Sequence, residues 1–175
     1  IELSPEKRVA ELEKAKQQTL RYIYFLQNQL GYKNLGLADD EFPTADRLAL
    51  IPYHREGRRM KGLVRFRVQD ISAPYQQLVA LYRTGIAVGD YPIDHHHRKN
   101  PEAPQHLGFY PVPSFSVPLG SLIPPTEFSG IIAAEKAISV SNVVNGTTRL
   151  QPCVILIGQA AGTLAALTIQ LGYSD

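Results

Sequence analysis

Three short runs of the sequence gather side chains that could bind or transform a small molecule. The first run places Arg55, Arg58 and Arg59 around one acidic residue, Glu56. Guanidinium groups can hold a carboxylate or a phosphate through paired hydrogen bonds, so this run could orient an anionic substrate. A solvated or ion-paired surface is the ordinary interpretation. Nucleic-acid binding is a weaker one, because the charges are not interleaved with aromatic residues at a known spacing.

The second run is an aspartate followed by three histidines, residues 94–97. Adjacent side chains of an extended chain point to opposite sides, so at most His95 and His97 share a face. A zinc site needs three or four ligands in suitable geometry, and the other two histidines are distant in sequence, so we expect no metal. An imidazole beside a carboxylate can line a binding cleft or move a proton.

The third run, residues 145–152, combines a turn, polar side chains and a proline that suits the first turn of a helix. The free amides and the positive dipole end of such a helix favour an anionic or electron-rich ligand atom. Capping by Thr147 or Thr148 is the ordinary alternative. Cys153 follows with no histidine nearby in sequence, so we expect a small buried side chain rather than a nucleophile.

Composition excludes several classes of function. The 175 residues include 18 Lys+Arg and 16 Asp+Glu, and a formal net charge of +2 is too small to make nucleic acid an expected partner. The length and the 44% of hydrophobic residues fit one folded domain or slightly more. A single cysteine excludes an internal disulfide framework and leaves the compartment open between cytoplasm and periplasm. The sequence contains no Gly-x-Ser-x-Gly, phosphate-binding loop, His-Glu-x-x-His or Gly-x-Gly-x-x-Gly motif.

Hydrophobic periodicity predicts the elements that would position these runs. An amphipathic helix is expected over residues 5–30, capped by Ser4, followed by a half-buried strand over 63–68. A short helix over 73–82 and an extended run over 85–92 would then lead into the histidines.

The second half of the chain alternates loops with short apolar segments. We expect a proline-rich loop over 98–118, a brief strand over 119–123 and a buried strand over 131–134. A polar loop over 135–149 would lead into a helix over 152–171, rich in alanine and glycine.

The last helix is apolar enough to raise the question of a membrane. Residues 150–174 carry no charge, which is long enough to cross a bilayer. Glutamines and threonines within this stretch, and the lack of basic residues after it, favour a helix buried in a large soluble domain, so we expect no membrane. The chain begins Ile-Glu-Leu and its one methionine is Met60, so we also expect it to be part of a longer protein; no signal peptide is visible.

Four runs, in this order, resemble the C-terminal half of a family of FAD-dependent oxidoreductases with a glutathione-reductase-type nucleotide fold. The resemblance extends over about residues 10–171. The runs are the helix end at 24–30, the arginine motif at 53–62, a Gly-x-Tyr-Pro-x-Asp-x-His pattern at 89–96, and the segments 119–124 and 131–167 with Gly-Gln-Ala-Ala-Gly at 158–162.

The resemblance implies an α+β fold divided in two. Residues 1–125 would form a helix and an antiparallel substrate-type domain, and residues 126–175 a strand-loop-helix that completes an FAD-binding domain. The N-terminal half, which carries the pyrophosphate-binding fingerprint in such proteins, would be a partner together with a small-molecule substrate. This chain alone would then bind FAD weakly or not at all, and the resemblance leaves oligomerisation open.

The same resemblance implies a role for each candidate residue. Arginines would orient the substrate and a histidine would carry the proton for hydride transfer to the flavin. This substrate side would consist of Arg55, Arg58, Arg59, Asp94 and His96. The flavin would be contacted by Glu135, Thr148, Arg149, Leu150, Gln151, Gly158 and Gln159, with the last helix pointing its N-terminus at the pyrimidine edge.

Two departures from the family pattern weigh against catalysis. The family usually has a Gly-Arg-Cys-like run after its last strand, and here the run is Glu-Lys-Ala at 135–137. A glutamate at this point would either reach a ribityl hydroxyl or block FAD. The family's Tyr-Arg-x-Leu position carries Gly120 instead of arginine. Glu135 and the missing pyrophosphate-binding fingerprint motivate the alternative, a non-catalytic structural or carbohydrate-binding descendant that has lost FAD.

Overall fold

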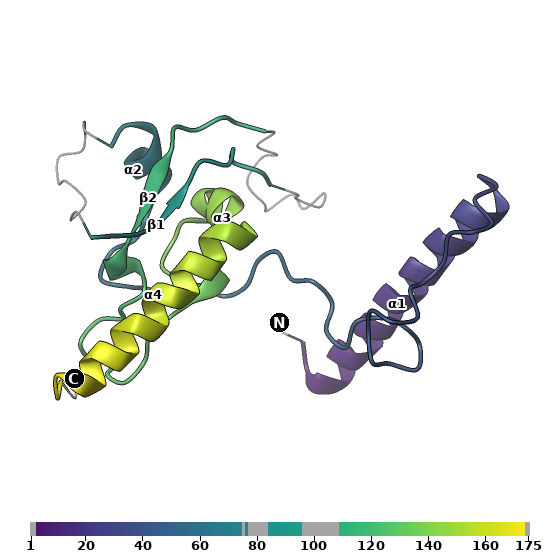
Figure 1. Cartoon of the computed structure of the whole chain (residues 1–175), viewed down its shortest axis with the longest axis horizontal. Helices are drawn as coiled ribbons and strands as arrows, with labels where there is room; N and C mark the ends of the chain where they lie inside the picture. The colour runs from purple at the N-terminus through teal and green to yellow at the C-terminus, as the bar shows by residue number, and fades with distance from the viewer. Residues whose placement is uncertain (1–2, 75, 77–83, 96–108, 174–175) are drawn as a thin grey trace. The chain divides into compact units, whose positions relative to one another are not determined.

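The computed structural model describes residues 3–74, 76, 84–95 and 109–173. They fall into two compact units, Ile1–His54 and Arg55–Asp175. The described part is mostly helical with one two-stranded antiparallel sheet, which matches the expected mixture of helix and antiparallel sheet in its coarse form (Figure 1). The expected division at residue 126 stays a prediction.

The first unit is built on helix α1 (Pro5–Asn28). Ser4 caps it by accepting a hydrogen bond from the Lys7 backbone N–H at 3.4 Å, and Pro5 occupies the first turn. The predicted helix over 5–30 is confirmed, ending slightly earlier. None of the described residues of this unit is buried, so α1 depends on its caps and local side-chain pairs.

The second unit contains the sheet, formed by strands β1 (Gly85–Gly89) and β2 (Phe115–Pro118). The predicted extended run over 85–92 is confirmed by β1. Strand β2, however, lies in the stretch expected to be a loop, and the predicted strand over 119–123 is instead the 3-10 turn η1 (Leu119–Ser121). The flanking prolines concealed a strand whose Phe115 and Val117 side chains are buried and whose register with β1 is set by that burial.

The segment before the sheet is extended but forms no continuous strand among the described residues. Side chains over 63–68 alternate between exposed and buried as predicted, yet only Phe66 pairs, through a parallel bridge to Val140. The short helix α2 (Val68–Ser72) then takes the chain away from the expected strand path. The predicted helix over 73–82 lies largely outside the described residues.

The predicted strand over 131–134 is not formed in the described structure. Its Ala133 N–H donates to Leu122 O at 2.9 Å, but no ladder follows. The chain turns instead into η2 (Glu135–Ala137). A strand needs a neighbour along its length, and none of the described strands lies there to supply one.

Helix α3 (Asn142–Thr148) occupies what was expected to be a polar loop. Ser141 caps it by accepting from the Val144 N–H at 3.3 Å. Its polar composition hid it from a search for apolar periodicity, because several of its buried positions hold asparagine, glycine and threonine.

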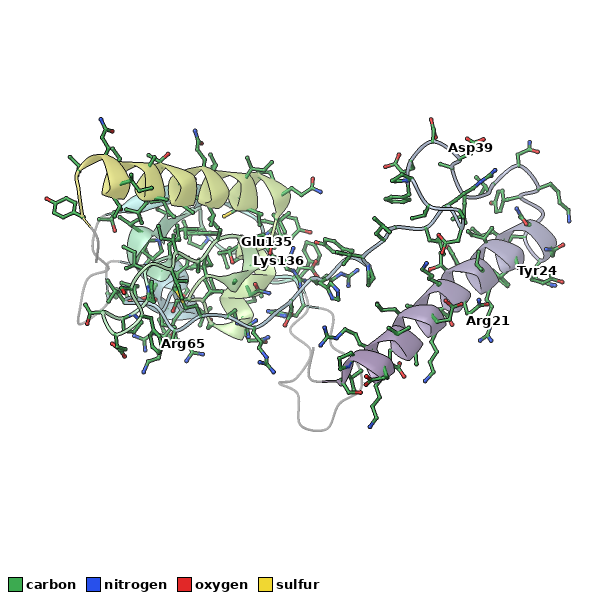
Figure 2. The ribbon with its side chains drawn as sticks, turned by 90° about the horizontal axis from the view of Figure 1, so that it is seen from below. Arg21, Tyr24, Asp39, Arg65, Glu135 and Lys136 are labelled. Carbon is green, nitrogen blue, oxygen red and sulfur yellow. The ribbon has the colours of Figure 1, made fainter. Side chains whose placement is uncertain are left out.

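Helix α4 (Gln151–Gln170) confirms the predicted terminal helix, and Gly172 follows it at a φ of 71°. It packs against β1 and η2, with Cys153 and Ile157 buried in the contact. Figure 2 shows α4 along one edge of the unit, with protein on one side only. Its other side carries exposed apolar residues such as Ile155. By length and composition alone, α4 could also cross a membrane, a property that core helices of soluble proteins share.

The core of the second unit lies between the sheet, the extended segment and α4. Phe66 and Phe115 meet at its centre with ring centroids 5.9 Å apart and planes at 52°. Buried aliphatic residues surround them, each stabilising the fold by about 1.5–3 kcal/mol through its removal from water. They include Ile71, Val117, Leu122, Ile138, Val140, Val144 and Ile157.

Candidate functional site

The carboxylate of Glu56 is the centre of a polar cluster in the second unit. Asn142 Nδ2 donates to Glu56 Oε2 at 3.0 Å, and Arg149 Nη1 donates to Oε1 at 3.4 Å. His95 Nδ1 lies 3.3 Å from Oε1, and Arg59 Nη1 lies 3.9 Å from Oε2. We call these five residues the Glu56 cluster.

Three stretches that are distant in sequence position this cluster. The arginine-rich run supplies Glu56 and Arg59. The histidine run supplies His95 after an isolated antiparallel bridge between Ile93 and Tyr110 has fixed the chain. Helix α3 supplies Asn142 from its first turn, and its C-cap residue is Arg149; the helix leads directly into α4 (Figure 1).

The histidine run and α3 are held tightly together by hydrogen bonds to the backbone. Arg149 Nη2 donates to Asp94 O at 2.7 Å, and Thr147 Oγ1 donates to Tyr91 O. Gly146 permits this approach, since a Cβ there would lie 2.7 Å from Asp94 O and 2.8 Å from His95 Nε2. The glycine in the middle of α3 is therefore explained by close packing rather than by a turn.

The charges of the Glu56 cluster do not cancel. One carboxylate faces two guanidinium groups, Arg59 and Arg149, and the Arg149 side chain is only 5% exposed. Charges interact more strongly where water is excluded, so the excess positive charge is felt at the adjoining surface. The arrangement therefore favours an anionic group next to the start of α4.

Asn145 is a buried polar side chain without a partner. It is 1% exposed, and neither its Oδ1 nor its Nδ2 has a hydrogen bond within the described structure. It follows Asn142 by three positions and precedes Arg149 by four, which places it on the same side of α3. An unsatisfied buried amide costs about 1–3 kcal/mol, so such a group is a candidate for ligand contact.

The first turn of α4 has no side-chain cap. Its N-cap is Leu150, which has no side-chain acceptor to offer, and Pro152 fills the start of the helix. The threonines expected as caps are used elsewhere: Thr147 bonds Tyr91 O, and Thr148 Oγ1 donates to Val144 O at 3.2 Å. The simple capping interpretation is therefore wrong, and no described side chain caps this turn.

The predicted substrate residues are brought together only in part. Arg59 belongs to the Glu56 cluster, whereas Arg55 and Arg58 are exposed. Asp94 contributes its backbone carbonyl to Arg149. His96 lies outside the described residues, and its role as proton carrier stays a prediction.

The predicted flavin residues divide between buried and exposed positions. Thr148 and Arg149 are buried, and Leu150 is half-buried at the helix start. The three residues on α4 itself are exposed: Gln151, Gly158 and Gln159. Among the described residues, no group of three or more His, Cys, Asp or Glu side chains could hold a metal ion.

Glu135 adopts a left-handed backbone with a φ of 57°, a conformation that favours glycine. Its carboxylate pairs with Lys136, and Figure 2 shows the two side chains near each other. Partial burial opposes ionisation of this carboxyl, but the hydrogen bonds and charge of Lys136 outweigh it and lower the pKa of Glu135.

His95, Glu56, Asn142 and Asn145 were not among the predicted site residues. A signal for His95 was present: Ile93 is apolar, and in an extended chain the side chain two positions later lies on the same face. Burial of both residues follows that rule. The two asparagines could be found only after α3 was known to be a helix.

Comparison with known proteins assigns the chain to a family. No curated protein and no solved structure matched it. A family model described as FAD dependent oxidoreductase matches residues 3–174, nearly the whole chain. The chain therefore belongs to the FAD-dependent oxidoreductase family.

Proposed function

We propose that this chain forms the flavin-capping and substrate-side part of an FAD-dependent oxidoreductase that acts on a small organic molecule. Family membership over residues 3–174 supports the general class. The observation that carries the finer assignment is the buried, unpartnered amide of Asn145 beside Arg149 and the uncapped start of α4. The remaining part of the FAD site would come from an N-terminal half with a glutathione-reductase-type nucleotide fold.

The residues around the start of α4 fit the pyrimidine edge of a flavin. The Asn145 amide offers both a donor and an acceptor, and the first-turn N–H groups of α4 offer further donors. The excess positive charge of the Glu56 cluster would stabilise negative charge on that edge. When bound, FAD would supply the chemistry of accepting a hydride from the substrate.

The arginine-rich run would bind the substrate. Arg55 and Arg58 are exposed and lie next to the cluster in sequence, and guanidinium groups suit a carboxylate or phosphate of the substrate. Arg59, held 3.9 Å from Glu56, would add to the local positive charge. Proton transfer is assigned to His96 with Asp94, by their place in the family pattern.

The exposed side of α4 would pack against the N-terminal half. A Cβ at Gly158 or Gly162 would meet no atom from outside its own turns of α4 within 4 Å among the described residues, so small residues lie open on this helix. Such a surface allows another backbone to approach closely. We also propose that neither a nucleic acid nor a membrane is a partner of this chain.

The alternative is a structural or carbohydrate-binding protein that keeps this fold without FAD. The observation that favours it is Glu135, because this residue holds a left-handed conformation at the position where the family usually has glycine. The backbone of Glu135 is thus of the kind that glycine adopts, while the side chain is larger. The same side chain would either contact the ribityl chain or occupy its place.

The test is a visible absorbance spectrum of the complete natural protein, with intact mass measured on the same sample. We expect a stoichiometric flavin band. Asn145→Leu should lower the affinity for FAD at least about 10-fold, and should stabilise this chain without FAD by about 1 kcal/mol, because it removes an unsatisfied amide. Asn34→Leu, at an exposed position of the first unit, is the matched control and should change neither. A colourless protein that also rejects added FAD would contradict the proposal and favour the alternative.

A further inference from the structure

We infer that Asn145 is a site of spontaneous deamidation, and that the closed helix α3 suppresses this reaction until the helix opens. Asn145 is followed by Gly146, and no other asparagine in the sequence precedes a glycine. Because glycine has no side chain, its backbone nitrogen can approach the amide carbon of the preceding asparagine without steric hindrance. The other asparagines precede glutamine, leucine, proline and valine: Asn28, Asn34, Asn100 and Asn142.

The reaction needs only the chain and water. The backbone nitrogen of Gly146 loses its proton to the solvent and forms a bond to Cγ of Asn145. The bond between Cγ and Nδ2 breaks, and Nδ2 takes up a proton from the solvent and leaves as ammonia. One water molecule then opens the resulting cyclic imide, which gives aspartate or isoaspartate at position 145. Nothing is oxidised or reduced in these steps.

The backbone of α3 keeps the two reacting atoms apart. The Asn145 N–H donates to Ser141 O at 2.9 Å, and the Arg149 N–H donates to Asn145 O at 3.2 Å, so this residue is held in the helix from both sides. The attack requires a rotation about ψ of Asn145 that turns the Gly146 nitrogen toward the side chain. Helical residues are confined to a ψ of about −42°, so the closed helix blocks the first step.

Packing around the two residues excludes the other reactants. Asn145 is 1% exposed, and Gly146 is also buried. A Cβ at Gly146 would lie 2.7 Å from Asp94 O, so the histidine run lies directly against this backbone. The base that removes the proton and the water that opens the imide therefore reach the site only when α3 separates from the histidine run.

The amide of Asn145 is not protected by a hydrogen bond of its own, because neither its Oδ1 nor its Nδ2 has a partner within the described structure. Protection therefore depends on the closed helix and on its packing. Deamidation replaces a group that donates and accepts by a carboxylate that only accepts. This inference goes beyond the proposed function and does not require it, because the reaction uses the chain's own atoms whether or not FAD is present.

The test measures the rate of deamidation at each asparagine of this chain in mildly alkaline buffer without flavin, with and without guanidinium chloride. Mass spectrometry of proteolytic fragments detects the conversion of an amide to an acid. In denaturant, Asn145 should react at least about 10-fold faster than Asn142, a control from the same helix, and Asn34, an exposed control. In the native chain the rate at Asn145 should be at least about 10-fold lower than in denaturant, because only the open fraction of α3 reacts.

The variant Ser141→Ala tests whether α3 controls the rate, because it removes the hydroxyl that caps this helix. It should accelerate the reaction at Asn145 in native buffer at least about 2-fold. The matched control is Ser4→Ala, which removes the corresponding cap of α1 and should leave this rate unchanged. If Ser141→Ala does not fold, its rate in native buffer should rise to the rate in denaturant.

Three results would overturn the inference. One is an equal rate at Asn145 in the native and the denatured chain. Another is a rate in denaturant that is no higher at Asn145 than at Asn142. The last is a rate in Ser141→Ala that does not exceed the rate in the unaltered native chain.

Discussion

At the scale of the residue, Glu135 combines an unfavourable backbone with an ion pair to Lys136 that is partly exposed. A non-glycine residue in the left-handed region costs about 1–2 kcal/mol, whereas an exposed ion pair contributes about 0–1 kcal/mol. The conformation persists because η2 and its contact with α4 are fixed by the core on either side. Because the backbone cost exceeds the contribution of the ion pair, a substitution at this position tests whether the surrounding fold imposes the left-handed conformation.

We expect Glu135→Gly to stabilise the chain by about 1 kcal/mol, because glycine adopts a φ of 57° without strain. Urea unfolding followed by circular dichroism measures the change. Glu127→Gly, in an exposed loop, is the control and should be neutral or slightly destabilising. A loss of stability in Glu135→Gly would show that the pair with Lys136 outweighs the backbone cost.

A second prediction concerns Cys153, the only cysteine. Burial raises the pKa of its thiol from 9.0 to about 11, so the folded state keeps a proton that the unfolded state loses in this window. Stability from this group is complete below pH 9 and declines as the pH rises toward 11. At pH 8 the thiolate fraction falls about 100-fold on folding.

Reaction with a thiol reagent should therefore be at least about 100-fold slower in the native chain than in denaturant, because the thiolate is the reactive form. The absorbance of the released chromophore gives both rates. Equal rates would mean that the start of α4 opens readily and that the buried position of the thiol is not maintained.

At the scale of the element, the two long helices and strand β1 were predictable, whereas β2, α3 and the absence of a strand over 131–134 were not. Helix α1 is marked in the sequence by Ser4 and Pro5 at its start, and α4 by an uninterrupted uncharged stretch. A glycine follows the end of each helix. Strand β2 and helix α3 are stabilised by burial against the rest of the unit. The prolines near β2 and the polar composition of α3 therefore misled the prediction. The strand over 131–134 failed for the reverse reason, since apolar residues alone do not supply a neighbouring strand.

Replacing a glycine by alanine should have opposite effects on stability in α3 and in α4. Gly146→Ala should destabilise the chain by about 1–3 kcal/mol, because its Cβ meets Asp94 O at 2.7 Å and His95 Nε2 at 2.8 Å. Gly158→Ala should stabilise it by about 0.5–1 kcal/mol, since nothing lies within 4 Å and alanine favours helix. Thermal unfolding of both variants checks the pair. A gain in Gly146→Ala would show that α3 does not pack closely on the histidine run.

At the scale of the whole molecule, the two units differ in how they are stabilised. The second has a core around Phe66 and Phe115, whereas no described residue of the first is buried. Backbone amides exchange their hydrogens more slowly where they are buried and open only cooperatively, so we expect slower exchange in the second unit. We expect amides of α1 to exchange by local opening, much faster than those of α3 and β1.

Mass spectrometry of exchanged fragments measures this difference. Ser4→Ala should accelerate exchange over α1, because it removes a helix cap of about 1 kcal/mol, and leave α3 unchanged. Equal protection of the two units would mean that α1 has a stabilising contact beyond those described for its own unit.

The sequence predicted which three runs form the candidate site, but not the contacts between them. The arginine-rich run, the histidine run and the start of the last helix were all identified, and the Glu56 cluster joins all three. The sequence did not show that His95 is the buried histidine or that Glu56 is the centre of the cluster. Both facts depend on contacts between stretches about 40–90 residues apart. Local pattern carries no information on such contacts.

The position of Glu56 has a consequence for how this protein can change over generations. Glu56 lies 3.3 Å from His95 and 3.4 Å from Arg149, so losing its carboxylate removes one contact from each of these two buried side chains at once. We therefore expect the effects of substitutions at Glu56, His95 and Arg149 to be coupled. Once one of these residues has changed, selection to keep the other two should weaken. We expect the three to be inherited together or lost together, so that a descendant lacking Glu56 would carry new residues at positions 95 and 149 as well.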